Sequence, residues 1–302
     1  MSRIIQLLGQ VAASNGLDKI TAERALITAP FGCTFFDECV RRFSASRAIQ
    51  KLSAENKALI LIVTSKKTKV RPVAGARVIQ IDPIPDWPQQ DRYQSRFVKW
   101  GIPYLFPRIR QSLYVDSDLH ITDSAEKLLR LFEEIGRHDC VMTKHETRRG
   151  WEDEYDQIIE KKRCINIRTL EEQRRVYRSE GLPADIPIFQ TNFIGRVHGS
   201  RFDALSAEVL TQMSRYSERD QLALPSAMRL SGLNPHGAEE GEFLYSAFKD
   251  RINRDAVCFV DGVVAGQFFL SRGRKEVSDA KKPGLLERAL NKLFLIAGSP
   301  RF

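Results

Sequence analysis

Short apolar runs rich in β-branched residues alternate with longer segments of helical periodicity through the first half of the chain. This alternation predicts an α/β fold in which helices cover the faces of a sheet. Each apolar run stops at a proline or at a polar cluster that can form a turn. The runs predict strands at residues 25–29, 59–64, 77–81, 111–118 and 140–143.

Apolar positions spaced three and four residues apart predict the helices. Segment 37–56 predicts one helix packed on the sheet, and a second helix begins at the serine cap Ser124 and ends at Gly136. The remaining predictions are helices at 170–181 and 202–216 and a hairpin at 256–270.

The composition is that of a globular protein of 302 residues, with 42% hydrophobic and 28% charged residues. Because no repeat or long linker interrupts the chain, we expect a single domain over 1–302. The longest nearly uncharged apolar stretch, 256–270, has 15 residues, fewer than the roughly 20 that span a bilayer. The N-terminus lacks the apolar core of a secretory signal. We therefore expect a cytoplasmic protein without a transmembrane helix.

The chain carries a net charge of +9, which favours an anionic partner such as an acidic saccharide, a nucleotide-linked substrate, a lipid headgroup or a nucleic acid. Basic residues are interspersed with acidic ones and form no recognisable nucleic-acid-binding motif, so we expect no nucleic acid partner. Five widely spread cysteines without a CxxC pair argue against a disulfide framework and a zinc site. Buried free thiols are the expected state.

The sharpest chemical signal is the pair Asp116 and Asp118, which follows directly on a predicted strand. Ligands of open α/β sheets bind beyond the carboxyl ends of strands. Alternation along the extended chain places both carboxylates on one side, where they can share Mn²⁺ or Mg²⁺. Such a cation could bridge the oxygens of a diphosphate. The alternative is an Asp-Ser-Asp turn that only ends the strand.

A phosphatase of the haloacid dehalogenase type uses the same spacing, with the first Asp attacking phosphorus. That motif requires Thr or Val where this chain has His120. The phosphatase therefore ranks second among the enzymatic hypotheses.

Three further segments carry candidate chemistry, each with an alternative role on the surface. In SERDQLAL, Asp220 and Gln221 open an apolar helix, and the alternative is an N-terminal charge or cap. The cations of TKHETRR at 143–149 suit a phosphate or a sugar carboxylate. Taken alone, that segment and FQTNFIGRVH at 189–198 are each more typical of a solvated surface.

The segments are more informative together than singly, because they occur in a particular order along the chain. KWGIPYLFP, SLYVDSDL, KHETRRGWEDEYD, YRSEGLP, FQTNFIGRVH and SERDQLAL follow one another along the chain. This succession, over about residues 25–224, resembles a family of GT-A-type glycosyltransferases that includes plant rhamnogalacturonan galacturonosyltransferases and bacterial polysaccharide glycosyltransferases. The resemblance implies one α/β domain with a Rossmann-like mixed sheet flanked by helices. It also implies metal-dependent transfer of a hexosyl or uronosyl group from a nucleotide sugar, with UDP as the nucleotide, to a saccharide hydroxyl in polysaccharide or glycoconjugate synthesis.

The resemblance also implies roles for individual residues. The expected donor-binding residues are Thr28, Ala29, Pro30, Gly32, Lys99, Asp116, His145, Arg148 and Arg196. The expected metal ligands are Asp116, Asp118 and His236, although a lone loop histidine is also common without any metal. The expected catalytic residues are Asp220, Asn192 and Gln221. If Asp220 is a general base the reaction inverts, whereas the galacturonosyltransferase resemblance favours retention, and the sequence leaves both open.

A non-catalytic module that binds an acidic glycan or a membrane is the other class of function. It is supported by 271–302, a basic C-terminal extension in which 281–298 forms one apolar helical face with lysines and arginines elsewhere. The alternative is a helix packed on the core. In the enzyme, the extension would give peripheral contact with the inner face of an anionic membrane, where a lipid-linked saccharide could serve as acceptor.

Overall fold

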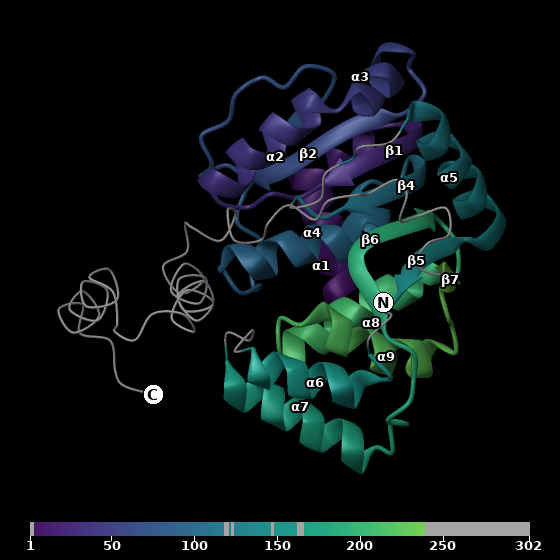
Figure 1. Ribbon diagram of the computed structural model, residues 1–302. Helices are drawn as coiled ribbons and strands as arrows, with labels where there is room; N and C mark the ends of the chain where they lie inside the picture. The colour runs from purple at the N-terminus through teal and green to yellow at the C-terminus, as the bar shows by residue number, and fades with distance from the viewer. Residues whose placement is uncertain (1–2, 118–120, 122–123, 146–147, 162–165, 239–302) are drawn as a thin grey trace, which may run out of the picture. The chain divides into compact units, whose positions relative to one another are not determined.

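The computed structural model describes residues 3–117, 121, 124–145, 148–161 and 166–238, all within one compact unit. Their centre is a sheet with the strand order β3-β2-β1-β4-β6-β5-β7 (Figure 1). The strands are β1 (Ala22–Thr28), β2 (Leu59–Ser65), β3 (Arg77–Ile81), β4 (Ile109–Val115), β5 (Cys140–Lys144), β6 (Phe189–Val197) and β7 (His236–Ala238).

The sheet is mixed, because β6 alone runs antiparallel to its neighbours β4 and β5, while the other pairings are parallel. From β1 the chain moves outward on one side to β2 and β3, and then crosses to β4 on the other side of β1. The order of the strands therefore reverses between β1 and β4. In open α/β sheets this reversal opens a ligand-binding crevice at the carboxyl ends of the two strands.

Helices cover both faces of the sheet (Figure 1). One core contains side chains of α1, α4, α8 and α9, the other those of α2, α3 and α5, and a smaller cluster joins α6 and α7 to α9. The predicted α/β class with a mixed sheet flanked by helices is confirmed. The helices are α1 (Arg3–Ser14), η1 (Leu17–Lys19), α2 (Cys33–Ala45), α3 (Arg47–Ala54), α4 (Asp91–Leu105), α5 (Ala125–His138), α6 (Trp151–Glu160), α7 (Ile167–Ser179), α8 (Phe202–Arg215) and α9 (Asp220–Ser231).

Three helix predictions were wrong in their boundaries, and one of them is that for 170–181, where α7 begins at Ile167 and ends at Ser179. Segment 37–56 belongs to two helices, because Ser46 adopts extended backbone angles and its hydroxyl accepts a hydrogen bond from the Ile49 N–H, which starts α3. Helix α5 continues through Gly136 to His138. A Cβ on Gly136 would lie 2.8 Å from Gln111 Nε2, so this glycine permits close packing on β4 and does not stop the helix.

Segment 189–198 is no solvated surface, since all but its last residue forms β6, which lies inside the sheet between β4 and β5. Cys39 and Cys140 are free and buried, as predicted for the thiols. None of the described helices is long and apolar enough to cross a membrane. The predicted hairpin at 256–270 and the predicted extension at 271–302 lie outside the described residues.

Candidate active site

The segment predicted to bind the donor lies at the carboxyl end of β1, beside the point where the strand order reverses. Thr28 is the buried last residue of β1. The next two carbonyl oxygens are fixed by side chains of other elements: Ala29 O accepts from the Ser95 hydroxyl at 2.9 Å, and Pro30 O from the Thr64 hydroxyl at 2.6 Å. Gly32, with φ 91° and ψ 143°, then leads into α2. Residues other than glycine rarely adopt these angles.

Asp116 is the first residue after β4, at the same end of the sheet as this segment. Its backbone N–H donates to the carbonyl oxygen of Asn192 at 2.8 Å. The structure therefore brings the predicted residues Asp116 and Asn192 together across β4 and β6. The Asp116 side chain is 34% exposed, so its carboxylate is accessible to a ligand. Asp118 lies outside the described residues.

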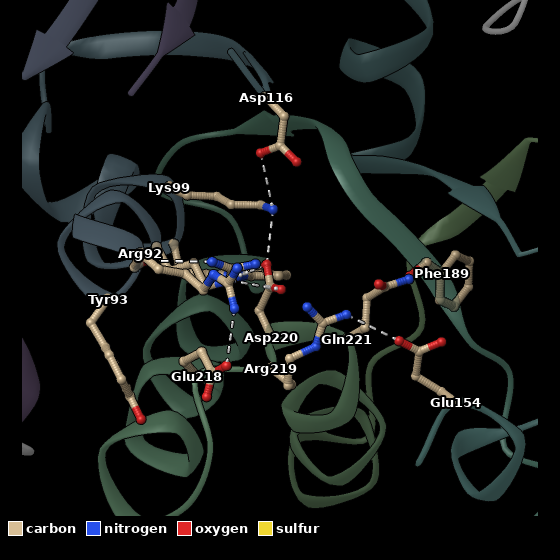
Figure 2. Close-up of polar contacts among 12 residues, drawn as sticks. Arg92, Tyr93, Lys99, Asp116, Glu154, Phe189, Glu218, Arg219, Asp220 and Gln221 are labelled. Atoms are coloured by element: carbon tan, nitrogen blue, oxygen red, sulfur yellow. Dashed lines mark hydrogen bonds and ion pairs between the residues drawn. The ribbon is translucent and has the colours of Figure 1, made fainter. Parts of the chain in front are cut away.

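Lys99 projects from α4 between two carboxylates. Its Nζ lies 2.8 Å from Asp220 Oδ2 and 3.4 Å from Asp116 Oδ1. Figure 2 shows the ammonium group between Asp116 on one side and Asp220 on the other. The Lys99 side chain is only 3% exposed, and burying such a charge is costly unless a counter-charge lies close to it.

Asp220, the first residue of α9, is buried and bound by three donors from α4. Arg96 Nε lies 3.1 Å from Oδ1, while Trp100 Nε1 at 3.1 Å and Lys99 Nζ share Oδ2. Burial raises the pKa of Asp220, but Lys99 and Arg96 outweigh it and hold the pKa well below its usual range. The cap in the alternative is wrong, because the N-cap residue is Arg219, whereas the N-terminal charge is present, since Asp220 lies in the first turn of α9. Side chains of α4 bind its carboxylate.

Arg92, Arg96, Trp100 and Glu218 are parts of the site that sequence reasoning missed. Arg92 Nη1 lies 3.3 Å from the fully buried Glu218. Burial and the neighbouring Arg96 and Arg219 lower the pKa of Arg92. A signal was present in DRYQSRFVKW, where cations spaced four and three residues apart lie on one face of a helix.

A second ion-pair group lies on the other side of Asp220. Glu154 of α6, 4% exposed, receives Arg148 Nε at 3.1 Å and Arg219 Nη2 at 3.3 Å. Gln221 Nε2 lies 3.4 Å from the Phe189 carbonyl oxygen (Figure 2). The predicted residues Arg148 and Gln221 therefore lie next to the group formed by Asp220 and its three α4 donors. Glu154 is a further residue that the sequence did not reveal.

His145 follows β5, and its backbone N–H donates to the carbonyl oxygen of Ile188 at 2.9 Å. This bond holds the segment after β5 against the chain that leads into β6. The structure thus places His145 at the end of β5, near the start of β6.

Two predicted residues lie apart from Asp116. Arg196 is 1% exposed in the core, where burial lowers its pKa to about 10. The ring of His236 stacks on that of His138 with centroids 3.8 Å apart. Strand register places His236 level with Leu113 and three strands from β4, which corresponds to about 14 Å at the usual strand spacing. The structure therefore does not bring His236 to Asp116.

Asp116 provides the described part of a possible metal site. Within 3–117, 121, 124–145, 148–161 and 166–238, no group of three or more His, Cys, Asp or Glu side chains could hold a metal ion. Mg²⁺ characteristically takes one or two carboxylates and completes its shell with water and substrate phosphates. An accessible carboxylate at the crevice fits that donor set.

A cavity of about 560 Å³ lies at the opposite end of the sheet, at the amino ends of β1, β2 and β3. Arg24, Ser53, Lys57 and Gly75 are among its lining residues. It is separate from the crevice, because the seven residues of β1 span about 20 Å between the two ends of the sheet.

An open α/β architecture with an aspartate at the crevice is the class that the fold and the site define. The family model described as "TOD1/MUCI70, glycosyltransferase-like domain" matches residues 55–258, about two thirds of the chain. The chain belongs to this family, and its class is that of the glycosyltransferases. The resemblance predicted from the sequence is confirmed. No curated protein matches the chain significantly.

Three solved structures show weak similarity to the chain. The bifunctional glycosyltransferase WbbM has a TM-score of 0.43 and 12% identity, and the match covers 69% of this chain but only 38% of WbbM. 2-C-methyl-D-erythritol 4-phosphate cytidylyltransferase from Thermus thermophilus has a TM-score of 0.38 and 13% identity, and the match covers 83% of this chain and 100% of the cytidylyltransferase. Mouse xyloside xylosyltransferase 1 has a TM-score of 0.35 and 12% identity, and the match covers 71% of this chain and 78% of the xylosyltransferase. The family assignment does not depend on these similarities.

Proposed function

We propose that the protein transfers a hexosyl or uronosyl group from a UDP-linked donor to a hydroxyl of a saccharide or lipid-linked saccharide. The observation that carries this proposal is the placement of Asp116 at the crevice, with the Lys99 ammonium 3.4 Å from its carboxylate. The Asp116 carboxylate, a suitable ligand for a divalent cation, therefore lies beside the positive charge of Lys99. A sugar diphosphate needs both when its leaving group departs.

The donor would lie between the segment 28–32 and Asp116, which flank the reversal of strand order. Fixed backbone at Ala29 and Pro30 supports a preformed contact surface for the nucleoside. Asp116, together with Asp118, would hold Mn²⁺ or Mg²⁺, which when bound supplies positive charge to the diphosphate oxygens. Lys99 would add a second positive charge from the protein itself.

Asp220 is a poor general base in this arrangement. Its carboxylate is buried and accepts from Arg96, Lys99 and Trp100, and its pKa lies well below the usual range. A base works best when its pKa is near the operating pH. We therefore assign Asp220 the role of a counter-charge for the α4 cations, which removes the argument for inversion that rested on it.

The family match favours transfer over the phosphatase and over a non-catalytic module. Cytoplasmic location and peripheral contact of 271–302 with an anionic membrane are kept as proposals. A lipid-linked acceptor would give that contact a purpose.

Nucleotide binding with and without metal tests the proposal. Isothermal titration of UDP, GDP, CDP and ADP in Mn²⁺ or in EDTA is expected to show one preferred nucleotide whose affinity requires the metal. Incubation with the corresponding nucleotide sugars should release that nucleotide. Binding of no nucleotide diphosphate in Mn²⁺ would contradict the proposal.

A further inference from the structure

Four segments far apart in the sequence meet in one line of side-chain contacts. Arg196 on β6 lies with Cζ 5.5 Å from the ring centroid of Trp100 on α4. The Trp100 indole N–H donates to Asp220 Oδ2 at 3.1 Å, and the same oxygen is 2.8 Å from Lys99 Nζ. Lys99 in turn reaches Asp116. The line runs from the interior of the protein to the crevice.

We propose that Trp100 and Arg196 are positioning residues for sugar transfer, which set the place of Asp220 and through it the place of Lys99 against Asp116. This inference rests on the proposed function. Neither residue is accessible to substrate, since each is 1% exposed. Their effect must pass through the contacts that they make.

The Arg196 guanidinium holds the Trp100 ring in place. Arg196 Nη1 donates to the Ser206 hydroxyl at 3.1 Å. Its Nε and Nη2 have no hydrogen-bond partner within the part of the chain that the structure describes. A buried cation with so few partners gains most from an aromatic face within about 6 Å. The Trp100 ring supplies that face, so the two groups fix each other.

The Trp100 N–H fixes the Asp220 carboxylate. It shares Oδ2 with Lys99 Nζ, while Arg96 Nε takes Oδ1. Loss of the indole donor leaves Oδ2 with Lys99 alone, so the carboxylate is fixed by two donors in place of three. The Lys99 ammonium, attracted to both carboxylates, would then shift relative to Asp116. A misplaced charge affects the transition state more than the ground state, because the leaving group becomes more negative only as the bond breaks.

Trp100→Phe tests the inference in the full chain, because phenylalanine keeps an aromatic ring and removes the N–H. We expect kcat to fall roughly tenfold to a hundredfold, with the KM for the donor within about twofold of wild type. Trp151→Phe is the matched control, since the Trp151 N–H donates to the Pro183 carbonyl oxygen on another part of the molecule. Unchanged kcat in Trp100→Phe would overturn the inference, as would equal losses in both variants.

A measurement independent of activity uses the three tryptophan indole N–H signals in an NMR spectrum of the ¹⁵N-labelled protein. Asp220→Asn is expected to shift the Trp100 signal and leave those of Trp87 and Trp151, which donate to backbone carbonyls. Arg196→Met is expected to shift the same signal. If neither substitution moves it, the inference is wrong whatever the activity. If the signals respond and no nucleotide sugar is turned over by the wild type, the proposed function fails and the contact line stands.

Discussion

Lys99 and Asp220 form an ion pair that is closed to solvent, with Nζ 2.8 Å from Oδ2 and both side chains 3% exposed. Lys99 comes from α4 and Asp220 from the first turn of α9, so the pair joins two helices directly beneath Asp116. Removing one member of a buried pair leaves an uncompensated charge and costs about 3–5 kcal/mol.

A double-mutant cycle tests this coupling. Lys99→Met leaves the Asp220 carboxylate with Arg96 and Trp100, and Asp220→Asn leaves Lys99 with the more distant Asp116. We expect each single substitution to lower the free energy of unfolding by more than about 2 kcal/mol. The double substitution should cost less than the sum by about 1–3 kcal/mol. Denaturant unfolding measures all four proteins, and strictly additive losses would show that the pair is not coupled.

Glu154→Gln tests the second ion-pair group. Glutamine keeps the shape of the side chain but leaves the Arg148 and Arg219 guanidiniums without their shared anion, so we expect a loss of about 3 kcal/mol in unfolding free energy. Glu152→Gln on the same helix is the control, because Glu152 is 21% exposed and its partners Arg174 and Arg178 are 24% and 57% exposed. Its loss should be about 1 kcal/mol or less. Equal losses of unfolding free energy in the two variants would contradict the claim that the buried pairs of Glu154 contribute more than the partly exposed pairs of Glu152.

His198 makes stability depend on pH. Burial lowers its pKa to about 3 from 6.5, while Phe106 O and the Ser112 hydroxyl bond the two ring nitrogens. Between these values the unfolded chain binds a proton that the folded protein does not, so stability falls as pH falls from 6.5 toward 3. The slope approaches about 1.4 kcal/mol per pH unit.

His198→Gln should remove that slope, measured as unfolding free energy at several pH values. Asp203 must be compared separately, because burial raises its pKa to about 6 from 3.8. Over that range the folded protein holds the extra proton, so Asp203 contributes a slope of opposite sign. Asp203 is present in both proteins, so the difference between their slopes isolates the histidine. An unchanged slope in His198→Gln between pH 6.5 and 3 would refute the role of the histidine.

Gly32→Ala probes the loop between β1 and α2. At φ 91° and ψ 143°, alanine is expected to cost about 1–3 kcal/mol of strain or to displace the loop, and nucleotide affinity should fall. Gly199→Ala is a matched control, because Gly199 has φ 75° and lies in a turn after β6 with open space around its α-carbon. Calorimetric titration should therefore separate the two variants by affinity, even where their losses of stability are alike. Equal affinities would remove the loop from the donor site.

The sequence predicted strands where β-branched and other apolar residues are concentrated, as in β2, where five of them follow one another, and in β3, where only Gln80 interrupts them. Strand β6 was missed because Gln190, Thr191, Asn192 and Arg196 interrupt its apolar pattern. The contacts of Arg196 are with Ser206 and the Trp100 ring, both outside the strand. A pattern read along one segment contains no information about such neighbours.

The same limit applies to the site. Asp116 was predictable because it directly follows an apolar strand. Asp220 was predictable because it is the first residue of an apolar helix. The role of Asp220 was not predictable, since it depends on Arg96, Lys99 and Trp100, over 100 positions earlier in the chain. Only the packing of α4 on α8 and α9 brings them together.

Asp116→Asn followed by calorimetric titration of UDP in Mn²⁺ and in EDTA tests the proposed donor site. Because Asp116 is partly exposed, the amide should leave the fold and the unfolding midpoint close to wild type. We expect the Mn²⁺-dependent gain in UDP affinity to be lost, since a neutral amide is a weak ligand for a hard cation. Asp86→Asn, at an exposed surface pair with Arg3, should bind as wild type. Retention of the full Mn²⁺-dependent affinity in Asp116→Asn would contradict the assignment of this crevice as the site of sugar transfer.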